Sequence, residues 1–184
     1  VLELVCHDSL SALPSPGEVD VAVVLVPPEP AVEAVREAGE VGIGNVVVVT
    51  AGFSEAGSEG AARERELAAA AEAFDLNLVG PNSLGVMSTP SGLNATFAPT
   101  SPDPGSISFM SQSGAFVTAV LDWAAERHLG FKDVVSLGNK AVLDESDLVR
   151  EWGEDPETDV VLGYLEDVAD GRRFVEVASE VTRE

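Results

Sequence analysis

The sequence predicts an α/β protein built from two parallel-sheet units. Continuous apolar runs, such as 21–26 and 46–49, alternate with segments whose apolar residues recur at helical spacing. Apolar runs that are buried on both faces and separated by helices are typical of parallel sheets covered on both sides. A proline-rich stretch at 98–105 interrupts this pattern, which restarts after it. We therefore expect a first unit over 1–99 and a second over 100–184.

The first unit alternates strand and helix. Pro27-Pro28 ends the first apolar run, and Pro30 suits the first turn of the helix that follows. Gly39 and Gly42 close that helix. We expect strands at 21–26, 46–49 and 77–79, and helices over 30–38 and about 61–74.

The second unit repeats the alternation. A short apolar run precedes a segment with helical periodicity that begins at Gly114. Asp144 and Asp147 have the spacing of a capping box, in which each side chain bonds the backbone of the other at a helix start. We expect strands at 106–110, near 134–135 and at 160–162, and helices from 114, from about 144 and over 174–181.

The chain is strongly acidic. It has 32 Asp and Glu against 10 Lys and Arg in 184 residues, a net charge of −22, and Lys132 and Lys140 are its only lysines. Such a surface repels nucleic acid and anionic membranes, so neither is expected as a partner. Excess carboxylate with few lysines is typical of proteins that work in high salt, where self-repulsion is screened. We expect a halophilic, haloarchaeal protein; an acidic cytosolic protein kept soluble by its charge is the alternative.

The composition also excludes several classes of protein and of site. Hydrophobic residues make up 45% of the chain, and no apolar run approaches the roughly 18 residues of a membrane span. No signal peptide is evident, and the single cysteine, Cys6, excludes an internal disulfide or a cysteine-based zinc site and is expected to be buried. We expect a cytoplasmic protein without a metal centre. The start at Val1, without Met, predicts that the chain is a fragment.

The turn Ser111-Gln112-Ser113-Gly114 lies between a predicted strand and a predicted helix. The first N–H groups of a helix have no intrahelical partner, and the helix dipole is positive there. Two serine hydroxyls add donors, so the turn suits a phosphate or another anion. The alternative is a plain helix cap by Ser113.

The other strand ends have similar chemistry. In open parallel sheets, ligands bind at the carboxyl ends of the strands. Each expected strand end consists of small, polar or glycine residues. The need for tight turns alone does not explain why all six ends share this composition. These ends are Pro27-Pro28, Thr50 to Phe53, Gly80 to Ser83, Ser111 to Gly114, Leu137 to Asn139 and Tyr164 to Glu166.

In this order and at these spacings, the strand ends resemble those of the nucleoside-diphosphate-forming acyl-CoA synthetases, relatives of the α subunit of succinyl-CoA synthetase. The resemblance covers nearly the whole chain and is nearest to the ADP-forming, acetate-type branch. The segments that show it are 19–22, 26–27, 50–55, Gly80-Pro81-Asn82-Ser83-Leu84-Gly85, 111–115, Ser136-Leu137-Gly138-Asn139-Lys140, 155–158 and 164–167.

The resemblance implies both a fold and a reaction. It implies a partial Rossmann-like CoA-binding domain over 1–99 and a partial flavodoxin-like, succinyl-CoA-synthetase-type domain over 100–184. The implied reaction is acyl-CoA + ADP + phosphate ⇌ carboxylic acid + CoA + ATP, through an acyl phosphate and a phosphohistidine. CoA, phosphate and a small acyl substrate are the ligands. ADP or ATP and Mg would lie on a separate ATP-grasp domain or β subunit, so an oligomer is implied.

The resemblance also assigns residues to CoA. Val49, Thr50 and Ala51 match a strand end that contacts CoA, with an ordinary strand-to-helix turn as the alternative. Asn82 matches a loop near the thioester, in which many relatives have cysteine where this chain has Ser83.

Five further residues match the reacting end of the family site. Ser111, Ser113 and Gly114 match the helix start that stabilises phosphate and phosphohistidine, and Thr118 lies where relatives contact the substrate carboxylate. Glu166 matches the carboxylate that orients the catalytic histidine, which fixes the tautomer of the imidazole and supports its charge. A solvated surface acid is the alternative for Glu166.

Two parts of the family pattern are missing. The first strand with its Gly-rich loop should precede residue 1, and the phosphorylated histidine should follow Glu184. Neither His7 nor His128 suits that role, because His7 precedes the first strand and His128 lies at the far end of the helix that begins at the phosphate turn. We therefore expect that 1–184 alone does not complete the reaction.

Two other functions fit parts of the sequence. The same module also occurs as a catalytically silent domain that senses CoA or acyl-CoA, for example fused to protein acetyltransferases. Retention of Glu166 together with the Ser111–Gly114 turn favours the ligase. A serine hydrolase using Ser113 would need a Gly-x-Ser-x-Gly elbow and a His–Asp pair, and neither is evident.

Overall fold

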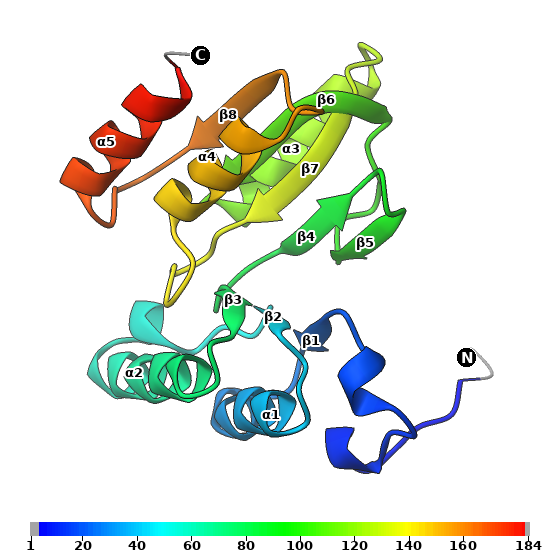
Figure 1. Cartoon of the computed structure of the whole chain (residues 1–184), viewed down its shortest axis with the longest axis vertical. Helices are drawn as coiled ribbons and strands as arrows, with labels where there is room; N and C mark the ends of the chain where they lie inside the picture. Colours follow the sequence, from blue (N-terminus) through cyan, green and yellow to red (C-terminus); the bar gives the residue numbers. More distant parts are fainter. Residues whose placement is uncertain (1–3, 183–184) are drawn as a thin grey trace.

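The computed structural model describes residues 4–182 and contains two sheets within them (Figure 1). The first sheet has three strands in the order β1-β2-β3, and the second has five in the order β5-β4-β7-β6-β8. The α/β class with parallel-sheet units, predicted from the apolar runs, is therefore confirmed.

The first sheet is wholly parallel. It consists of β1 (Ala22–Val24), β2 (Asn45–Val48) and β3 (Asn77–Val79), close to the expected ranges. Helices α1 (Pro28–Glu40) and α2 (Ser58–Glu72) pack against each other and share one core cluster with these strands (Figure 1). Val46, Val47 and Val48 of the central strand β2 are all buried although their side chains alternate between the two faces of the sheet, as the unbroken valine run predicts.

The second sheet is covered on both faces. Strand β6 (Pro104–Ser111) runs parallel to β7 (Phe131–Ser136) and β8 (Val160–Tyr164). Consecutive residues of a strand point to opposite faces. Phe109 accordingly packs in the cluster of α3 (Gly114–Ala125), whereas Met110 packs in the cluster of α4 (Glu145–Glu154) and α5 (Gly171–Val181).

A hairpin that the sequence did not predict completes the second sheet. Strands β4 (Gly85–Ser88) and β5 (Leu93–Thr96) pair antiparallel, and β4 also pairs antiparallel with β7. The second sheet is therefore mixed rather than purely parallel. Both hairpin strands lie within 1–99, yet they belong to the second sheet, so the chain changes sheets between Val79 and Gly85.

Local chemistry sets the helix starts. Asp144 and Asp147 form the predicted capping box at α4, with both reciprocal hydrogen bonds present. Ser113 caps α3, because its Oγ accepts from the Phe116 N–H at 3.3 Å. Cys6, expected to be buried, is exposed, because it lies in the irregular segment before β1. Among the described residues, no helix is both long and apolar enough to cross a bilayer.

Candidate functional site

The carboxyl ends of the two sheets meet through backbone hydrogen bonds. Three N–H groups of the loop after β7 donate to carbonyl oxygens of the segment at and after β3: Asn139 to Pro81 (2.9 Å), Ala141 to Gly80 (3.0 Å) and Leu143 to Leu78 (3.2 Å). Gly138 permits this approach, because its φ is +59° and a Cβ built there would lie 2.1 Å from the Pro81 oxygen. Any side chain at this position would separate the two units.

Asn82 and Ser83 form the crossover between the units. The Asn82 N–H donates to the Thr50 oxygen of the first unit at 2.9 Å, and its Nδ2 donates to Oδ1 of Asn139 at 3.2 Å. The buried Ser83 hydroxyl donates to the Ser136 oxygen at the end of β7 at 2.6 Å. Asn82 is thus fixed between the end of β2 and the loop that follows β7.

A cavity of about 470 Å³ lies at this junction. It brings together candidates for the CoA contact and candidates for the phosphate contact, although the two sets lie in different units. None of its lining side chains is ionisable, in a chain whose net charge is −22. The lining residues are Val49, Ala51, Asn82, Ser83, Leu84, Phe97, Gln112, Gly114, Ala115 and Thr118.

The first turn of α3 forms one wall of the cavity. Gly114 and Ala115 line it, and their N–H groups are among those that a helix leaves without an intrahelical partner. Ser113, just before this turn, does not itself line the cavity; its Oγ accepts from the Phe116 N–H, which leaves its own hydrogen free to donate. The Thr118 hydroxyl donates back to the Gly114 oxygen at 3.3 Å. This wall therefore presents donors and the positive end of a helix dipole.

Two predicted residues lie behind the cavity wall. Ser111 is fully buried, and its Oγ donates to the Ser113 oxygen at 2.9 Å and accepts from the Ser113 N–H at 3.0 Å. Its hydroxyl therefore shapes the turn. The Thr50 hydroxyl donates to the Val26 oxygen at 2.6 Å, which ties the end of β2 to the end of β1.

Glu166 follows β8 and is exposed. Its N–H donates to Oε1 of Gln112 at 2.6 Å, and the Asp167 N–H donates to the same oxygen at 3.1 Å. Since Gln112 lines the cavity, Glu166 is held beside the cavity although it does not line it.

A buried ion pair lies next to this loop. The Lys140 Nζ donates to Oε2 of Glu145 at 3.0 Å, to Oδ1 of Asp167 at 2.6 Å and to the Asp167 oxygen at 3.1 Å. Burial alone would lower the pKa of Lys140, but the hydrogen bonds to Asp167 and Glu145 outweigh it and raise that pKa. The hydrogen bond from Lys140, followed by that from Gln112, lowers the pKa of Asp167.

Asn139 joins the site to the first unit through carboxylates. Its Nδ2 lies 2.6 Å from Oε2 of Glu55 and 2.7 Å from Oε2 of Glu64. Partial burial would raise the pKa of Glu55, but the hydrogen bonds from Asn139 and from the Gly52 N–H outweigh it and lower that pKa. The sequence patterns assign no role to Gln112, Asn139, Lys140, Glu145 or Asp167. The one feature that could have pointed to this network is Lys140 itself, a lysine at a strand end in a chain with two lysines.

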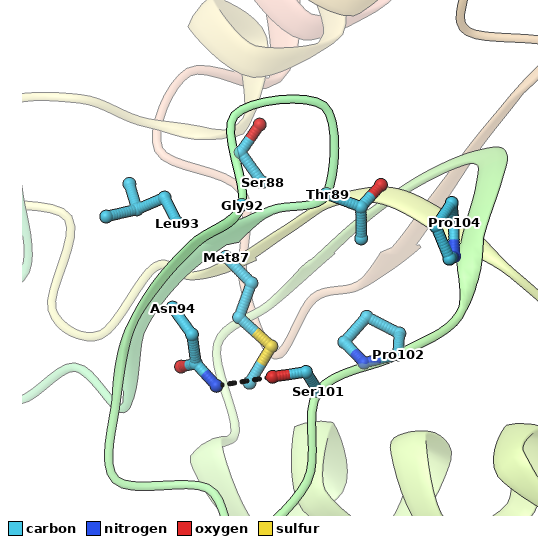
Figure 2. Close-up of a pocket in the computed structure, with 9 residues that line it drawn as sticks. All are labelled: Met87, Ser88, Thr89, Gly92, Leu93, Asn94, Ser101, Pro102 and Pro104. Atoms are coloured by element: carbon cyan, nitrogen blue, oxygen red, sulfur yellow. Dashed lines mark hydrogen bonds between the residues drawn. The ribbon is translucent and has the colours of Figure 1, made fainter.

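A second, smaller cavity lies at the β4–β5 hairpin (Figure 2). It has a volume of about 180 Å³, and no ionisable side chain lines it. Its wall is closed by a hydrogen bond of 2.8 Å from Asn94 Nδ2 to Ser101 Oγ (Figure 2). No candidate site residue lies in it, so the junction cavity is the candidate site.

Comparison with protein families divides the chain into two matches. A model described as "CoA binding domain" matches residues 1–89. A model described as "Succinyl-CoA ligase like flavodoxin domain" matches residues 104–184. The candidate site therefore combines strand ends from both matched regions.

Individual relatives match nearly the whole chain. The chain is 48% identical over 183 residues to "Acetate--CoA ligase [ADP-forming] I" of Archaeoglobus fulgidus, covering 100% of this chain and 26% of that protein. It is 42% identical over 173 residues to the α subunit of "Acetate--CoA ligase [ADP-forming] I" of Pyrococcus furiosus, covering 94% of this chain and 37% of that subunit. The chain thus spans a quarter to two fifths of these relatives.

A solved structure has the same fold. The "dinucleotide forming Acetyl-coenzyme A synthetase 1" of Ca. Korarchaeum cryptofilum superposes with a TM-score of 0.92 at 38% identity, covering 99% of this chain and 39% of that one. The same protein has been solved in complex with phosphate and ADP.

Proposed function

The chain is homologous to the α-subunit-like region of the ADP-forming acetyl-CoA synthetases, and we propose that it supplies the CoA and phosphate part of such an enzyme. The complete enzyme would convert acyl-CoA, ADP and phosphate into the carboxylic acid, CoA and ATP. The first unit would bind CoA, and the second would bind phosphate and assist phosphoryl transfer.

One observation supports this proposal most directly: the junction cavity joins the two candidate sets and has no charged lining. Carboxylates at a phosphate site would repel the ligand, and this wall is free of them in a chain with 32 acidic residues. Because no basic residue lines the cavity, the N–H groups at the start of α3 are its donors for one inorganic phosphate, and the rest of the lining suits the uncharged pantetheine arm and thioester of CoA better than its several phosphates.

The roles follow from the positions of the residues. Val49, Ala51 and Asn82 would contact the CoA arm, with Thr50 holding the strand end behind them. Ser113 and Gly114 would donate to phosphate from the start of α3, with Ser111 shaping their turn. Thr118 would contact the substrate carboxylate. Glu166 would orient the phosphorylated histidine.

The remaining chemistry is assigned to other parts of the enzyme. His128 lies beyond the last turn of α3, at the opposite end from the cavity, and His7 lies before β1, so neither suits phosphoryl transfer. The phosphorylated histidine, the nucleotide and its Mg would come from further segments and from an ATP-grasp domain or β subunit. This arrangement requires an assembly of both parts.

The test is phosphoenzyme formation in the complete enzyme with any partner chain. Incubation with ATP labelled at the γ-phosphate should give protein label that is acid-labile and base-stable, and acetate plus CoA should discharge it. Absence of label together with intact CoA binding would point instead to a CoA-sensing module. The comparisons give no support to that alternative, because the matched relatives named above are ligases.

We also propose that the protein is adapted to high salt, on the basis of its charge, and that it is cytoplasmic, on the basis of its single cysteine. A net charge of −22 is strongly self-repulsive, and salt screens this repulsion. Lowering KCl from molar to millimolar should therefore unfold the protein, which circular dichroism would detect. A spectrum that does not change with salt would contradict the high-salt adaptation.

A further inference from the structure

We propose that Lys140 and Glu145 are positioning residues for Glu166: their buried ion pair anchors the loop after β8 and so holds Glu166 beside the cavity. This inference rests on the function proposed above, through the role given to Glu166. Neither residue touches the cavity, so their effect is exerted through the loop.

The burial of this pair is the first argument. The Glu145 side chain is 0% exposed and that of Lys140 is 6% exposed. A buried ion pair is often no more stabilising than a well-packed apolar pair, because both charges lose their hydration. A gain in folding stability is therefore a weak explanation for a buried lysine at position 140. The defined hydrogen-bond geometry that Lys140 gives to its neighbours is a stronger explanation.

The hydrogen bonds are the second argument. All three donors of the Lys140 ammonium are used, and two of them go to Asp167 in the loop. Oε1 of Glu145 accepts from the Ala169 N–H at 2.7 Å. Gln112 binds the Glu166 and Asp167 N–H groups from the side of the cavity. The side chains of Lys140, Glu145 and Gln112 thus hold the backbone on both sides of Glu166, and the Glu166 side chain stays exposed.

The other lysine provides a matched control. Lys132 is also buried, with a side chain 10% exposed, and it pairs with Asp155 and Glu157. It lies at the start of β7, whereas Lys140 follows the end of that strand. Lys132→Met and Lys140→Met remove the same group from similarly buried sites in one unit, but only the second removes contacts to the loop.

The experiment measures single-turnover phosphoenzyme formation and the KM for CoA in the complete enzyme. Lys140→Met combined with Glu145→Leu removes both charges together, so that no lone buried charge threatens folding. Asp167→Ala removes the exposed partner, whose side chain is 75% exposed. We expect both variants to slow phosphoenzyme formation about 10- to 100-fold, the size expected for a misplaced group, with the KM for CoA within about twofold of wild type. Lys132→Met should leave the rate unchanged per folded molecule.

A double-mutant cycle separates positioning from general stability. If the network acts through Glu166, adding Asp167→Ala to Glu166→Gln should slow the reaction by less than about twofold. Multiplicative effects of the two substitutions, or an equal loss in Lys132→Met, would overturn the inference. A parallel rise in the KM for CoA would overturn it as well.

Amide hydrogen exchange tests the loop without any activity. The Glu166, Asp167 and Ala169 amides should exchange at least about tenfold faster in the Lys140→Met, Glu145→Leu enzyme than in Lys132→Met. Unchanged exchange would refute the anchoring. If the wild-type enzyme forms no phosphoenzyme, the proposed function fails, and the exchange result then decides separately whether this network holds the loop.

Discussion

The two units contribute to one cavity by different means. The first unit presents small uncharged side chains, Val49 and Ala51, on strand ends fixed by backbone hydrogen bonds. The second presents the start of a helix and, outside the cavity, an ion-pair network centred on Lys140 that holds the loop after β8. The first wall is therefore defined by volume, and the second by hydrogen-bond donors beside a loop that charges hold in place.

Because the two walls differ in this way, they should tolerate different amino-acid substitutions. A wall defined by volume should accept polar changes of equal size but not added bulk. A wall defined by hydrogen-bond donors should respond to the loss of a single donor with little change of volume, and the loop beside it should respond to the loss of a single charge. The following predictions test that division in order of decreasing effect.

The largest effect is expected from Glu166→Gln. The substitution keeps the size of an exposed side chain but removes the charge proposed to orient the histidine. Phosphoenzyme formation should fall by roughly 10²- to 10⁴-fold, as for other groups that assist proton or charge transfer, while the KM for CoA stays within about twofold. Rapid-quench measurement of the labelled enzyme gives the rate, and unchanged turnover would remove the assigned role.

A smaller effect of the opposite kind is expected from Ala51→Trp. Ala51 is exposed at the cavity wall, so the indole should fill part of the cavity without disturbing the core. The KM for CoA should rise about 10- to 100-fold, a loss of about 1.4 to 2.8 kcal/mol, while labelling by ATP continues at the wild-type rate. Ala69→Trp, at an exposed position on α2, is the control. Equal effects of the two tryptophans would contradict the volume-defined wall.

A third, smaller effect is expected at Ser113, whose two possible roles, capping α3 and binding phosphate, predict different results. Ser113→Ala should cost about 1 kcal/mol of folding free energy through loss of the α3 cap, whereas Ser113→Gly should cost only a few tenths. If the hydroxyl also binds phosphate, both variants should raise the KM for phosphate about three- to tenfold. An unchanged KM in both would make Ser113 a cap alone.

The smallest effect is a pH dependence that differs between the units. The lowered pKa of Glu55 means that its contact with Asn139 stabilises the protein above the ordinary value of 4.5 and is lost as pH falls through the lowered pKa. The raised pKa of Lys140 means that its contribution is present below the ordinary value of 10.5 and is lost above the raised pKa.

Thermal unfolding as a function of pH measures both contributions. Glu55→Gln should flatten the acid limb, with a difference in Tm of no more than about 2 °C, because this contact is largely exposed. Replacing the Lys140 pair should flatten the alkaline limb and, because Lys140 lowers the pKa of Asp167, should also change the acid limb. An unchanged alkaline limb in this variant would contradict the contribution assigned to Lys140.

Much of the fold could be predicted from local signals. A buried valine run located β2, the short apolar pair Leu78-Val79 located β3, and the Asp144–Asp147 spacing located the start of α4. The β4–β5 hairpin could not be predicted in this way, because its strands have four residues each and are partly exposed. Its stability comes from pairing with β7, which lies some 45 residues further along the chain than β4.

The candidate site was predictable only in outline. The rule that ligands bind at the carboxyl ends of parallel strands pointed to Ala51, Asn82 and Gly114, and the structure places all three around one cavity although the strands before them belong to two sheets. That rule does not give burial, so Ser111 was expected to donate to a ligand although its hydroxyl bonds its own turn. The contacts among Lys140, Glu145 and Asp167 depend on how the loop after β7, the start of α4 and the loop after β8 meet, which no local pattern specifies.

The backbone hydrogen bonds between the loop after β7 and the segment after β3 have a consequence for selectivity. These hydrogen bonds fix the separation of the two walls when the chain folds. The entropy cost of bringing the walls together is therefore part of folding and does not weaken ligand binding. A cavity with immobile walls discriminates by ligand length, because a longer or shorter molecule meets no surface that adjusts to it. Gly138, which allows the two backbones to touch, would in this sense help to set the length of ligand that the proposed site accepts, although it does not line the cavity.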